Sequence, residues 1–442
     1  MIVSRAFADK TYAVLGLARS GLATVASLAA SGARVIAWDT REEARDLVAD
    51  TADIADPLTI DMTGFAGVVV SPGVPLNRHP IADKARADGV PVIGDIELFA
   101  LARKCLPAHR VVGITGTNGK STTTALIHHI IETAGIPTRM GGNIGLPILG
   151  QDPLPEGGIY VLELSSYQID LTYSLDCDVA VLLNITPDHL DRYDGFEGYV
   201  ASKARLFAMQ SADHAAVIAT DDEPSRAIIK SLGQRATRVS GEDIDRAAQA
   251  RWPSLQGPHN AQNVAVAAAV ARALGIGEAI IERALASYAS LPHRMQRVAE
   301  VNGVLYVNDS KATNAASTAP ALAAYPPIHG KPRVHWILGG IAKTDNLDEC
   351  VPYYPYVKHA YTMGESGHMF ADLLRDHMPV DDSEMLLTAV RRAARIAEPG
   401  DVVLLSPACA SFDQFRDFEA RGDAFVAAVE AVQSQESVSD AQ

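Results

Sequence analysis

Short apolar runs alternate with segments of helical spacing along most of the chain. The runs lie, in chain order, at 12–15, 34–38, 68–70, 111–114, 160–164, 179–185, 215–219, 304–308, 334–339, 360–363 and 402–406. Between them, apolar residues recur at the three-to-four-residue period of a helix that packs on one face. Such alternation is typical of parallel sheets covered by helices, so the pattern predicts an α/β fold.

The length of the chain predicts more than one domain. At 442 residues it exceeds the size at which a single hydrophobic core keeps growing, so two to three domains are expected. The first series of runs closes near residue 98, and the second ends near Leu291-Pro292-His293-Arg294. The predicted domains are therefore 1–98, 99–293 and 294–442, each long enough to form an α/β unit.

A glycine-rich loop, Thr115-Gly116-Thr117-Asn118-Gly119-Lys120-Ser121, lies between an apolar strand and an amphipathic helix. Its glycines let backbone N–H groups converge on an anion at a helix N-terminus, and Lys120 adds a point charge. Ser121 is then left to coordinate Mg²⁺. The strict phosphate-loop pattern has glycine where this chain has Ile114, and a tight turn without a ligand is the alternative. ATP is the first ligand to consider.

A second loop of this kind, Gly16-Leu17-Ala18-Arg19-Ser20-Gly21, follows the first strand, and Asp39 ends the next one. The arrangement is typical of a dinucleotide site, but Ala18 replaces the glycine that lets the backbone approach a pyrophosphate. This weakens an NAD interpretation, while Arg19 and Ser20 could meet a nucleotide diphosphate from the side. Ser71-Pro72-Gly73 ends another strand at the same rim. A Rossmann-like domain without a nucleotide is the alternative.

Three polar residues follow or accompany the predicted central strands. Glu163 ends an apolar strand where phosphate-loop proteins place a carboxylate against Mg²⁺, although a capping or salt-bridged glutamate is the alternative. His189 lies in a strand-end loop on the expected nucleotide face, and alone it indicates only a hydrogen-bonded histidine. Lys203 lies on a helix that looks exposed, so its pattern alone predicts a solvated lysine.

Asn260 and Asn263 are three residues apart at the start of an alanine-rich helix, so their amides share one face. They could recognise an adenine edge or a phosphate, and N-capping is equally consistent with the pattern. Arg294 stands at the junction of the second and third domains. It could reach a transferring phosphoryl group on domain closure, or form an interdomain salt bridge.

Polar loops end three strands of the third domain, at 309–314, 339–343 and 406–412. The first of them holds an acid, a base and a hydroxyl in Asp309, Lys311 and Thr313. Because the carboxyl ends of parallel strands meet at one rim, these loops predict a ligand site there.

Charge and cysteine content narrow the classes of partner. With 38 Lys and Arg against 53 Asp and Glu, the formal net charge is −15, which argues against nucleic acid or an anionic membrane as the main partner. Cys105, Cys177, Cys350 and Cys409 are far apart, as expected for buried thiols in a reducing cytosol. The first residues lack the apolar region of a signal peptide, so we expect a cytoplasmic protein.

Together these motifs resemble the Mur ligase family over nearly the whole chain. The segments that carry the resemblance are 116–121, 163–168, 184–193, 259–263, 291–294, 309–314 and 406–412. The resemblance implies an N-terminal Rossmann-like domain that holds UDP, a central P-loop ATPase domain and a C-terminal Rossmann-like domain for the incoming amino acid, with ATP between the last two. It implies a monomeric ATP-dependent amide ligase that adds D-glutamate to UDP-N-acetylmuramoyl-L-alanine through an acyl phosphate, in cytoplasmic peptidoglycan precursor synthesis.

The resemblance also implies roles for individual residues. The catalytic set is Lys120, Glu163, His189, Lys203 and Arg294. The ATP-binding set is Gly116, Thr117, Asn118, Gly119, Lys120, Ser121, Thr122, Asn260, Asn263, Arg294 and Asp309. The set for the UDP-linked substrate is Leu17, Ala18, Arg19, Ser20, Asp39, Thr40, Arg41, Ser71, Pro72, Gly73, Asn143 and His189. The D-glutamate set is Lys311, Thr313, Lys343, Ser411 and Phe418.

Two Mg²⁺ ions are implied as well, with Ser121, Glu163, His189 and a carbamoylated Lys203 as the metal set. Carbamoylation needs a neutral amine, and a nearby dication disfavours the ammonium form while stabilising the carbamate. The segment Gly339-Gly340-Ile341-Ala342-Lys343 departs from the Gly-Gly-Asp-Gly-Lys often seen in the family, so the role of Lys343 depends most on the resemblance.

Four alternatives remain open from the sequence. Within the family, an L-alanine-adding or a polyglutamylating ligase is possible, although the latter would lack the UDP-holding first domain. An NAD-linked oxidoreductase would use the loop at 16–21 but leaves the loop at 115–121 unexplained. A non-catalytic ATP-binding regulator would need only Lys120 and Glu163, and the loop-rich third domain argues against it.

Overall fold

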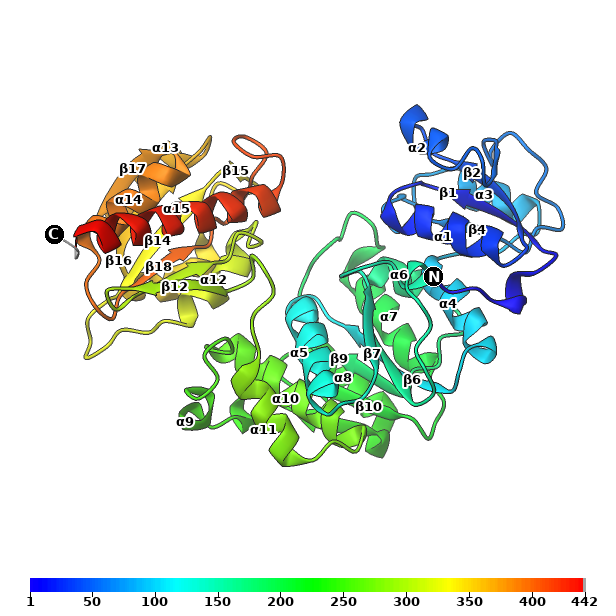
Figure 1. Cartoon of the computed structure of the whole chain (residues 1–442), viewed down its shortest axis with the longest axis horizontal. Helices are drawn as coiled ribbons and strands as arrows, with labels where there is room; N and C mark the ends of the chain where they lie inside the picture. Colours follow the sequence, from blue (N-terminus) through cyan, green and yellow to red (C-terminus); the bar gives the residue numbers. More distant parts are fainter. Residues whose placement is uncertain (440–442) are drawn as a thin grey trace. The chain divides into compact units, whose positions relative to one another are not determined.

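The computed structural model describes residues 1–439 and contains three large sheets, each covered by helices (Figure 1). The chain divides into two compact units. The first unit is Met1–Asp243 with Gln262–Ala284, and it holds the first two sheets. The second unit is Ile244–Ala261 with the chain from Leu285 onward, and it holds the third. The predicted α/β class is confirmed.

The first sheet has the strand order β3-β2-β1-β4-β5, and all its pairs are parallel. Its strands are β1 (Thr11–Leu15), β2 (Arg34–Trp38), β3 (Asp53–Ile54), β4 (Gly67–Val70) and β5 (Val92–Ile93). Its helices are α1 (Arg19–Ala30), α2 (Glu42–Asp46), α3 (Ile81–Ala87) and α4 (Asp95–Ala102). The central strands are apolar along their length because helices cover them on both faces.

The second sheet has the order β11-β10-β9-β6-β8-β7 and is also parallel. Its strands are β6 (His109–Thr115), β7 (Thr138–Gly142), β8 (Gly158–Glu163), β9 (Val179–Leu182), β10 (Ala215–Ala219) and β11 (Ala236–Val239). Helices α5 (Lys120–Thr133), α6 (Ser166–Asp170), α7 (Gly195–Ala208) and α8 (Glu223–Leu232) connect them, and α9 (Arg246–Gln249), α10 (Pro258–Ala273) and α11 (Glu278–Ser287) follow. The phosphate loop joins the central strand β6 to α5, so it sits at the carboxyl edge of this sheet.

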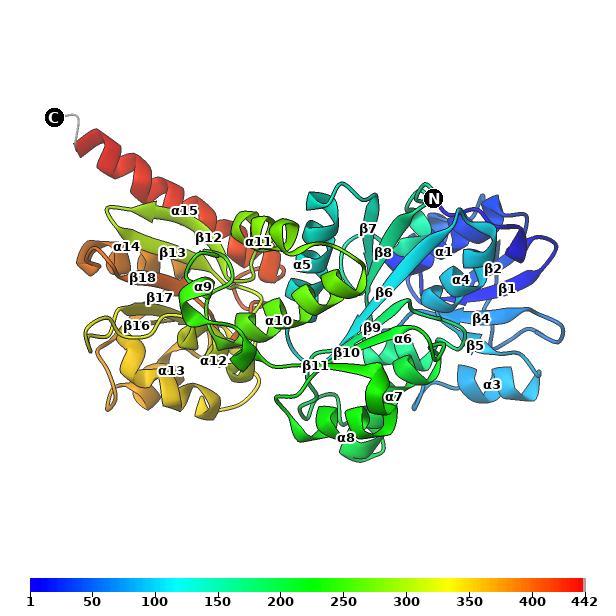
Figure 2. The ribbon, with the colours of Figure 1, turned by 90° about the horizontal axis from the view of Figure 1, so that it is seen from below.

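The third sheet has the order β12-β13-β18-β14-β16-β17, in which only β12 is antiparallel to its neighbour. The strands are β12 (Gln296–Val301), β13 (Val304–Asn308), β14 (Val334–Gly339), β16 (Val357–Met363), β17 (Val380–Glu384) and β18 (Val402–Leu405). A small antiparallel pair, β15 (Ile341–Ala342) and β19 (Cys409–Ala410), lies beyond their ends. Helices α12 (Ala315–Ala323), α13 (Gly367–Leu374), α14 (Leu386–Ile396) and α15 (Phe418–Ser439) complete the unit, with α15 lying along α14 and β12 (Figures 1 and 2).

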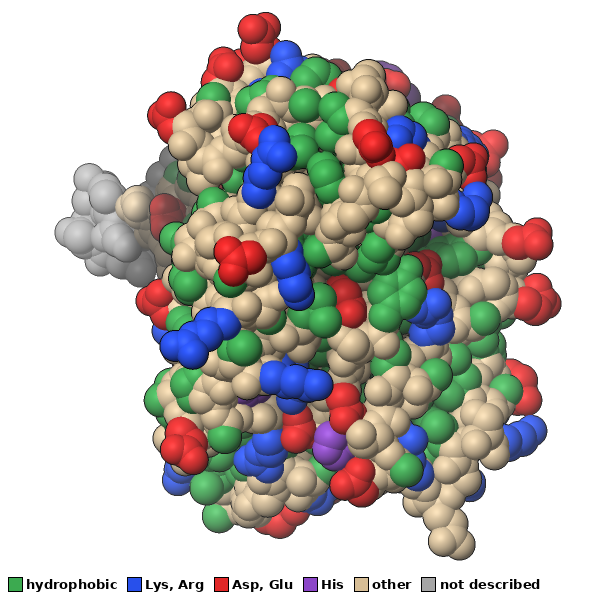
Figure 3. Space-filling model, turned by 90° about the vertical axis from the view of Figure 1, so that its right-hand side faces the viewer, with side chains coloured by type: hydrophobic (Ala, Val, Ile, Leu, Met, Phe, Trp, Pro, Cys, Tyr) green, Lys and Arg blue, Asp and Glu red, His purple; other side chains and the backbone are tan. Residues whose placement is uncertain are grey.

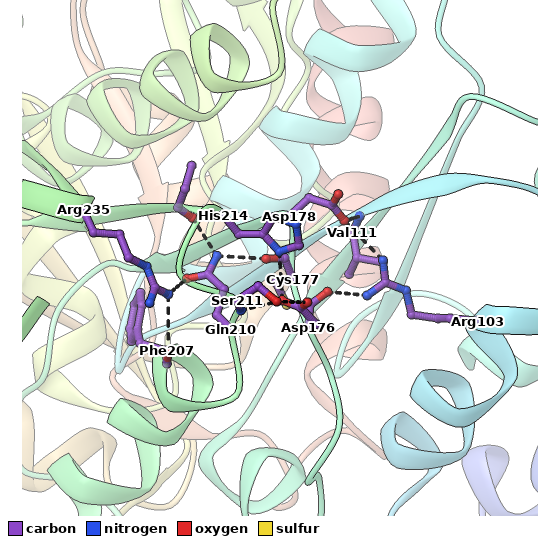
Figure 4. A network of polar contacts seen from close by, with 11 residues as sticks. Arg103, Val111, Asp176, Cys177, Asp178, Phe207, Gln210, Ser211, His214 and Arg235 are labelled. Carbon is purple, nitrogen blue, oxygen red and sulfur yellow. Dashed lines mark hydrogen bonds and ion pairs between the residues drawn. The ribbon is translucent and has the colours of Figure 1, made fainter.

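A polar network fixes the end of α4 to the base of the second sheet (Figure 4). Arg103 follows α4, and its Nη2 donates to Asp178 Oδ2 at 3.2 Å, while the Val111 N–H donates to the same oxygen at 2.8 Å. Asp176 accepts from Ser211 Oγ at 2.6 Å and contacts His214 Nδ1 at 2.8 Å. The start of β9 is therefore held at the end opposite the phosphate loop.

Two adjacent threonines of α5 differ in whether their buried hydroxyl has a hydrogen-bond partner. Thr123 and Thr124 are both fully buried, and the Thr123 hydroxyl donates to Asn263 Oδ1 at 3.0 Å. The Thr124 hydroxyl has no hydrogen-bond partner among the described residues. Thr124→Val should leave stability unchanged or raise it by up to about 1 kcal/mol, because it removes a desolvated hydroxyl. Thr123→Val should cost about 1–3 kcal/mol, because it removes a buried hydrogen bond to the Asn263 amide oxygen. Denaturant unfolding of both variants checks the contrast, and equal effects would contradict it.

Within residues 1–439, no helix combines the length and the apolar character needed to cross a membrane. On the face drawn in Figure 3, acidic and basic side chains are interspersed among apolar and neutral ones.

Candidate functional site

The phosphate loop bends around its own lysine. Lys120 is the first residue of α5, and its Nζ donates to the carbonyl oxygens of Gly116 at 2.9 Å and Thr117 at 2.7 Å. Gly119 has a φ of +81°, and a Cβ there would lie 2.5 Å from Asn263 Oδ1, so only glycine fits. Ser121 follows at the second position of the helix and is buried.

Residues of the second sheet hold the loop from the side. The side-chain amide of Asn184 bonds to the backbone of Asn118 twice. Its Oδ1 accepts the Asn118 N–H at 2.8 Å, and its Nδ2 donates to the Asn118 carbonyl at 3.2 Å. The Thr117 hydroxyl contacts Tyr199 Oη at 3.2 Å and accepts the Thr186 N–H at 3.0 Å. The sequence analysis gave no role to Asn184 or Tyr199.

Glu163 ends β8 beside the loop and is 2% exposed. Its Oε1 accepts from Asn143 Nδ2 at 2.9 Å, whereas its Oε2 has no partner among the described residues. The alternative of a salt-bridged glutamate is therefore not observed in the described part of the chain. A buried carboxylate oxygen left without a donor fits a cation, because desolvating a charge without compensation is costly. Asn143, which is predicted to contact the UDP-linked substrate, donates the hydrogen bond to Oε1.

Lys203 is buried, with 1% exposure, so the expectation of a solvated lysine is wrong. Its Nζ donates to the Gly116 carbonyl at 2.8 Å, the same oxygen that Lys120 contacts, and lies 4.6 Å above the Tyr199 ring. Burial, and then repulsion from Lys120, lower the pKa of Lys203 to about 7. A large fraction of this amine is therefore neutral near neutral pH.

His189 stands in a strained turn of the loop after β9. Its φ is +52°, in the left-handed region, and its side chain is 49% exposed. The ring packs 5.1 Å from that of Tyr167 and its Nε2 lies 3.5 Å from Asp188 Oδ2. Strain of this kind persists only where the surroundings hold it, and it concentrates at functional sites.

The two predicted amides of α10 lie inside the helix, so neither is its N-cap. Asn263 is 2% exposed and supports the loop through Thr123 and the close approach to Gly119. Asn260 is 3% exposed and donates to the Gln256 carbonyl at 3.0 Å.

The loop at 16–21, in the domain of the first sheet, opens onto a hollow of about 390 Å³. It is lined by Leu17, Ala18, Arg19, Leu22, Arg41, Glu43, Ala44 and Leu47. The hollow thus brings together four predicted substrate residues and adds apolar walls that the sequence analysis did not identify. Leucine walls suit a flat apolar ring, and the two arginines suit phosphates.

Asp39 shapes this hollow from behind. Its Oδ2 accepts the Leu17 N–H at 2.7 Å and its Oδ1 the Arg41 N–H at 3.0 Å. Burial opposes ionisation, but these N–H groups outweigh it and hold the pKa of Asp39 below its usual value. Thr40 lies between Asp39 and Arg41 in the chain.

Ser20, Ser71 and Pro72 line a separate cavity of about 10 Å³, the size of a single water, together with Asp95. Gly73 follows them in the loop after β4. Asp95 is buried, which raises its pKa to about 6.

In the second unit, Asp309 directly follows β13 and is buried. Its carboxylate accepts the Met295 N–H at 3.1 Å and the Ser406 hydroxyl at 2.9 Å, and burial raises its pKa to about 7. Arg294 is close enough to lower that pKa in part, so the structure brings this predicted pair together.

The residues predicted to frame D-glutamate lie in the loops that follow β13, β14 and β18, except for Phe418, which begins α15. Lys311 Nζ is 3.8 Å above the Phe418 ring, and Ser411 is buried. Thr313 is partly buried and Lys343 is exposed. A Cβ on Gly339, whose φ is +123°, would lie 1.9 Å from the Met363 carbonyl oxygen.

The departure at Ile341-Ala342 is accommodated by the short strand β15, which pairs with β19 and leaves Lys343 directly after it. Arg421 of α15, which the sequence analysis missed, ties these loops together. Its guanidinium donates to the carbonyls of Ser310 at 2.8 Å and Cys409 at 3.0 Å, and it is 1% exposed. Burial lowers its pKa to about 10.

His259 predicts a pH dependence of stability. Its side chain is partly buried, its buried Nδ1 has no partner among the described residues, and burial lowers its pKa to about 4. Because the folded pKa lies below the unfolded value near 6.5, its contribution is complete above pH 6.5 and is lost as pH falls toward 4. Between those limits it should remove roughly 3 kcal/mol. Unfolding free energies of the wild type and His259→Gln over this range check the slope, with exposed His329→Gln as the control. An equal slope in all three would contradict the assignment.

Among the described residues, no group of three or more His, Cys, Asp or Glu side chains is placed to hold a metal ion. Any cation here would need ligands of other kinds, such as hydroxyls, or groups supplied by a substrate.

Comparisons with known proteins agree over the whole length. Three family models match: Mur ligase MurD-like, N-terminal domain at residues 10–94, Mur ligase middle domain at 114–253, and Mur ligase, glutamate ligase domain at 293–409. The chain is 68% identical over 437 residues to the UDP-N-acetylmuramoylalanine--D-glutamate ligase of Novosphingobium aromaticivorans, covering 98% of this chain and 97% of the relative. The ligase of the same name from Sphingopyxis alaskensis is 65% identical over 433 residues, with 98% and 100% covered.

Solved structures support the fold alone. A UDP-N-acetylmuramate-alanine ligase from Thermotoga maritima matches with a TM-score of 0.56 at 16% identity, covering 96% of this chain and 99% of that one. A pseudomurein peptide ligase type C from Methanothermus fervidus gives a TM-score of 0.55 at 16% identity, covering 96% and 100%. Together, the comparisons count against an NAD-linked oxidoreductase and a non-catalytic regulator.

Proposed function

The chain belongs to the Mur ligase family, and we propose that it is the ATP-dependent amide ligase that joins D-glutamate to UDP-N-acetylmuramoyl-L-alanine in peptidoglycan synthesis. The observation that carries this proposal is the full-length similarity to relatives whose name states that activity. The matches at the MurD-like N-terminal domain favour it over an L-alanine-adding or polyglutamylating ligase.

The nucleotide side of the proposal rests on the phosphate loop. Lys120 sits at the N-terminus of α5, where backbone N–H groups and the helix dipole favour the phosphates of ATP. We assign Gly116, Thr117, Asn118, Gly119, Ser121 and Thr122 to phosphate binding, and Asn260, Arg294 and Asp309 to ATP from the second unit. Asn263 is assigned to supporting the loop.

The metal side rests on Glu163 and Lys203. The Glu163 oxygen that has no donor fits Mg²⁺. The resemblance to the family adds the Ser121 hydroxyl as a second ligand. With its pKa near 7, Lys203 can react with CO₂ as the free amine, which replaces a cation by a carboxylate-like anion. We propose that Ser121, Glu163, His189 and carbamoylated Lys203 hold two Mg²⁺ ions. When bound, such ions neutralise charge on the triphosphate and on the attacking carboxylate.

We propose a stepwise reaction. A carboxylate is a poor electrophile, so the alanyl carboxylate first takes the γ-phosphoryl group of ATP, giving an acyl phosphate and ADP. The amine of D-glutamate then attacks the acyl carbon, and phosphate leaves as the amide forms. Phosphoryl transfer needs mainly positioning and charge stabilisation, which Lys120 and Arg294 supply.

The substrate side rests on the hollow of the first sheet. Leu17, Ala18, Arg19 and Arg41 line it, and we propose that they hold the UDP group, with Asp39 fixing the loop. We also assign to the UDP-linked substrate the remaining predicted residues, Ser20, Thr40, Ser71, Pro72, Gly73, Asn143 and His189. In the second unit, two cations, Lys311 and Lys343, match the two carboxylates of D-glutamate. Thr313, Ser411 and Phe418 complete that site.

The remaining proposals concern organisation. We propose domain boundaries at 1–98, 99–293 and 294–442, a monomeric enzyme and a cytoplasmic location. The family and the absence of a membrane-crossing helix within residues 1–439 support the location, and the three family models support the division.

Phosphate release across a panel of UDP-muramoyl precursors and amino acids tests the function. Release should require UDP-N-acetylmuramoyl-L-alanine and D-glutamate together, with the amide product seen by mass spectrometry. L-Glutamate, L-alanine and the unalanylated precursor are the controls. Release with L-alanine and the unalanylated precursor would replace the proposal by the L-alanine-adding ligase.

A further inference from the structure

Arg192 joins the loop after β4 in the first sheet to the His189 turn of the second. Its Nη2 donates to the carbonyl oxygens of Pro72 at 3.3 Å and Val74 at 3.1 Å. Its guanidinium lies 4.2 Å above the ring of Tyr167. One side chain thus contacts the substrate-side rim and the element that packs on His189.

The backbone of Arg192 closes the same turn. Its N–H donates to the His189 carbonyl at 2.9 Å, so side chain and main chain together hold His189 at its positive φ. Tyr167 lies between them, 5.1 Å from the His189 ring and stacked on Tyr193 at 6.1 Å. Tyr193 in turn donates its hydroxyl to Asp170 at 2.9 Å.

A parallel contact shows that the two loops meet as a unit. Asn77 Nδ2 donates to the Asp191 carbonyl at 3.0 Å, next to Arg192 in the chain. Arg192 donates to both carbonyls from Nη2 while the planar face of its guanidinium covers the Tyr167 ring, and the compact ammonium of lysine has no such flat face to stack. A purely structural contact would not need this position, because the sheets are already joined through α4 and the Arg103 network.

We propose that Arg192 is a positioning residue that couples the UDP-substrate site to the nucleotide site by fixing the loop of Pro72 and Val74 against the His189 turn. This inference rests on the proposed function. Binding of the UDP-linked substrate stabilises the loop after β4. Because the Arg192 guanidinium is bonded to that loop, the turn that carries His189 also loses mobility. ATP binding then benefits from a turn already held in place.

Calorimetry with a non-hydrolysable ATP analogue and Mg²⁺ tests the coupling in the full-length protein. The dissociation constant of the analogue is measured with and without UDP-N-acetylmuramoyl-L-alanine. The wild type should bind the analogue more tightly with the substrate present. In Arg192→Ala the ratio of the two constants should fall by about 2- to 30-fold, toward one. Binding of UDP alone should stay within about twofold, since Arg192 does not line its hollow.

Two further variants separate positioning from stability. Arg192→Lys keeps the charge and should lose the coupling as the alanine variant does; it also carries the test should that variant fail to fold. Arg333→Ala is the matched control: Arg333 lies 5.6 Å above Tyr325 and donates to the Pro326 and Gly400 carbonyls, far along the chain from the site. It should keep the wild-type ratio.

Kinetics add a second readout. Arg192→Ala should raise KM for the UDP-linked substrate by about 2- to 30-fold, the size of the lost coupling, because Arg192 acts on the site and not on the substrate itself. A wild-type ratio of one, or a wild-type ratio in either Arg192 variant, would overturn the proposal. If the wild type binds both ligands cooperatively but forms no amide, the proposed function fails and the coupling stands. If the wild type forms amide but its two dissociation constants are equal, the coupling fails and the proposed function stands.

Discussion

Lys203→Ala should abolish ligation, with kcat falling by at least about 10³-fold, because the variant cannot form the carbamate that we propose as a ligand of Mg²⁺. The side chain is buried beside Lys120, and both lysines contact the Gly116 carbonyl. A permanent ammonium there would repel a dication, whereas its carbamate would attract one. A small carboxylate such as acetate or formate should therefore restore part of the activity.

Lys203→Arg separates the carbamate from a simple charge role. Arginine keeps a cation and cannot form the carbamate, so we expect it to be as inactive as alanine and insensitive to added anions. ¹³C-labelled bicarbonate should give a carbamate resonance in the wild type that both variants lack. Full activity in unrescued Lys203→Ala would refute the carbamate role, and activity in Lys203→Arg would show that a cation suffices.

The interior of each sheet was predictable because its strands are apolar on both faces. The runs at 215–219, 304–308 and 334–339 match β10, β13 and β14 residue for residue. The strands of the three large sheets that the pattern missed are β3, β5, β7, β11, β12 and β17. All six lie at sheet edges, where a strand needs no continuous apolar run. β17, with the sequence Val-Asp-Asp-Ser-Glu, carries the polar side chains of an edge that faces solvent.

The predicted run at 179–185 is longer than β9, which ends at Leu182. The difference has a local cause. Asn184 leaves the ladder to pair its side chain with Asn118 of the phosphate loop, so an apolar run continues where the strand does not. Sequence periodicity registers the apolar residues but not this contact, which forms between segments 66 positions apart.

The candidate site divides in the same way. Lys120 and Glu163 were predictable because a loop or strand end fixes each of them locally. Lys203 was not, because its burial depends on the loop that carries Gly116, 87 positions away. Arg192 and Arg421 bond to backbone carbonyl groups of distant loops. Every residue has such a carbonyl, so the pattern of residue types cannot indicate these contacts.

Glu163→Gln should stabilise the protein while reducing ligation by about 10²- to 10³-fold. The carboxylate is 2% exposed, and one of its oxygens lacks a partner among the described residues, so the free protein keeps a poorly compensated charge. The neutral amide keeps the Asn143 contact and relieves that cost, for a gain of about 1–3 kcal/mol. Thermal unfolding and phosphate release measure the two effects, and exposed Glu156→Gln, at the turn before the same strand, is the control. A variant that loses both stability and activity would show that the carboxylate is satisfied within the fold, which would remove the physical reason for placing a cation beside it.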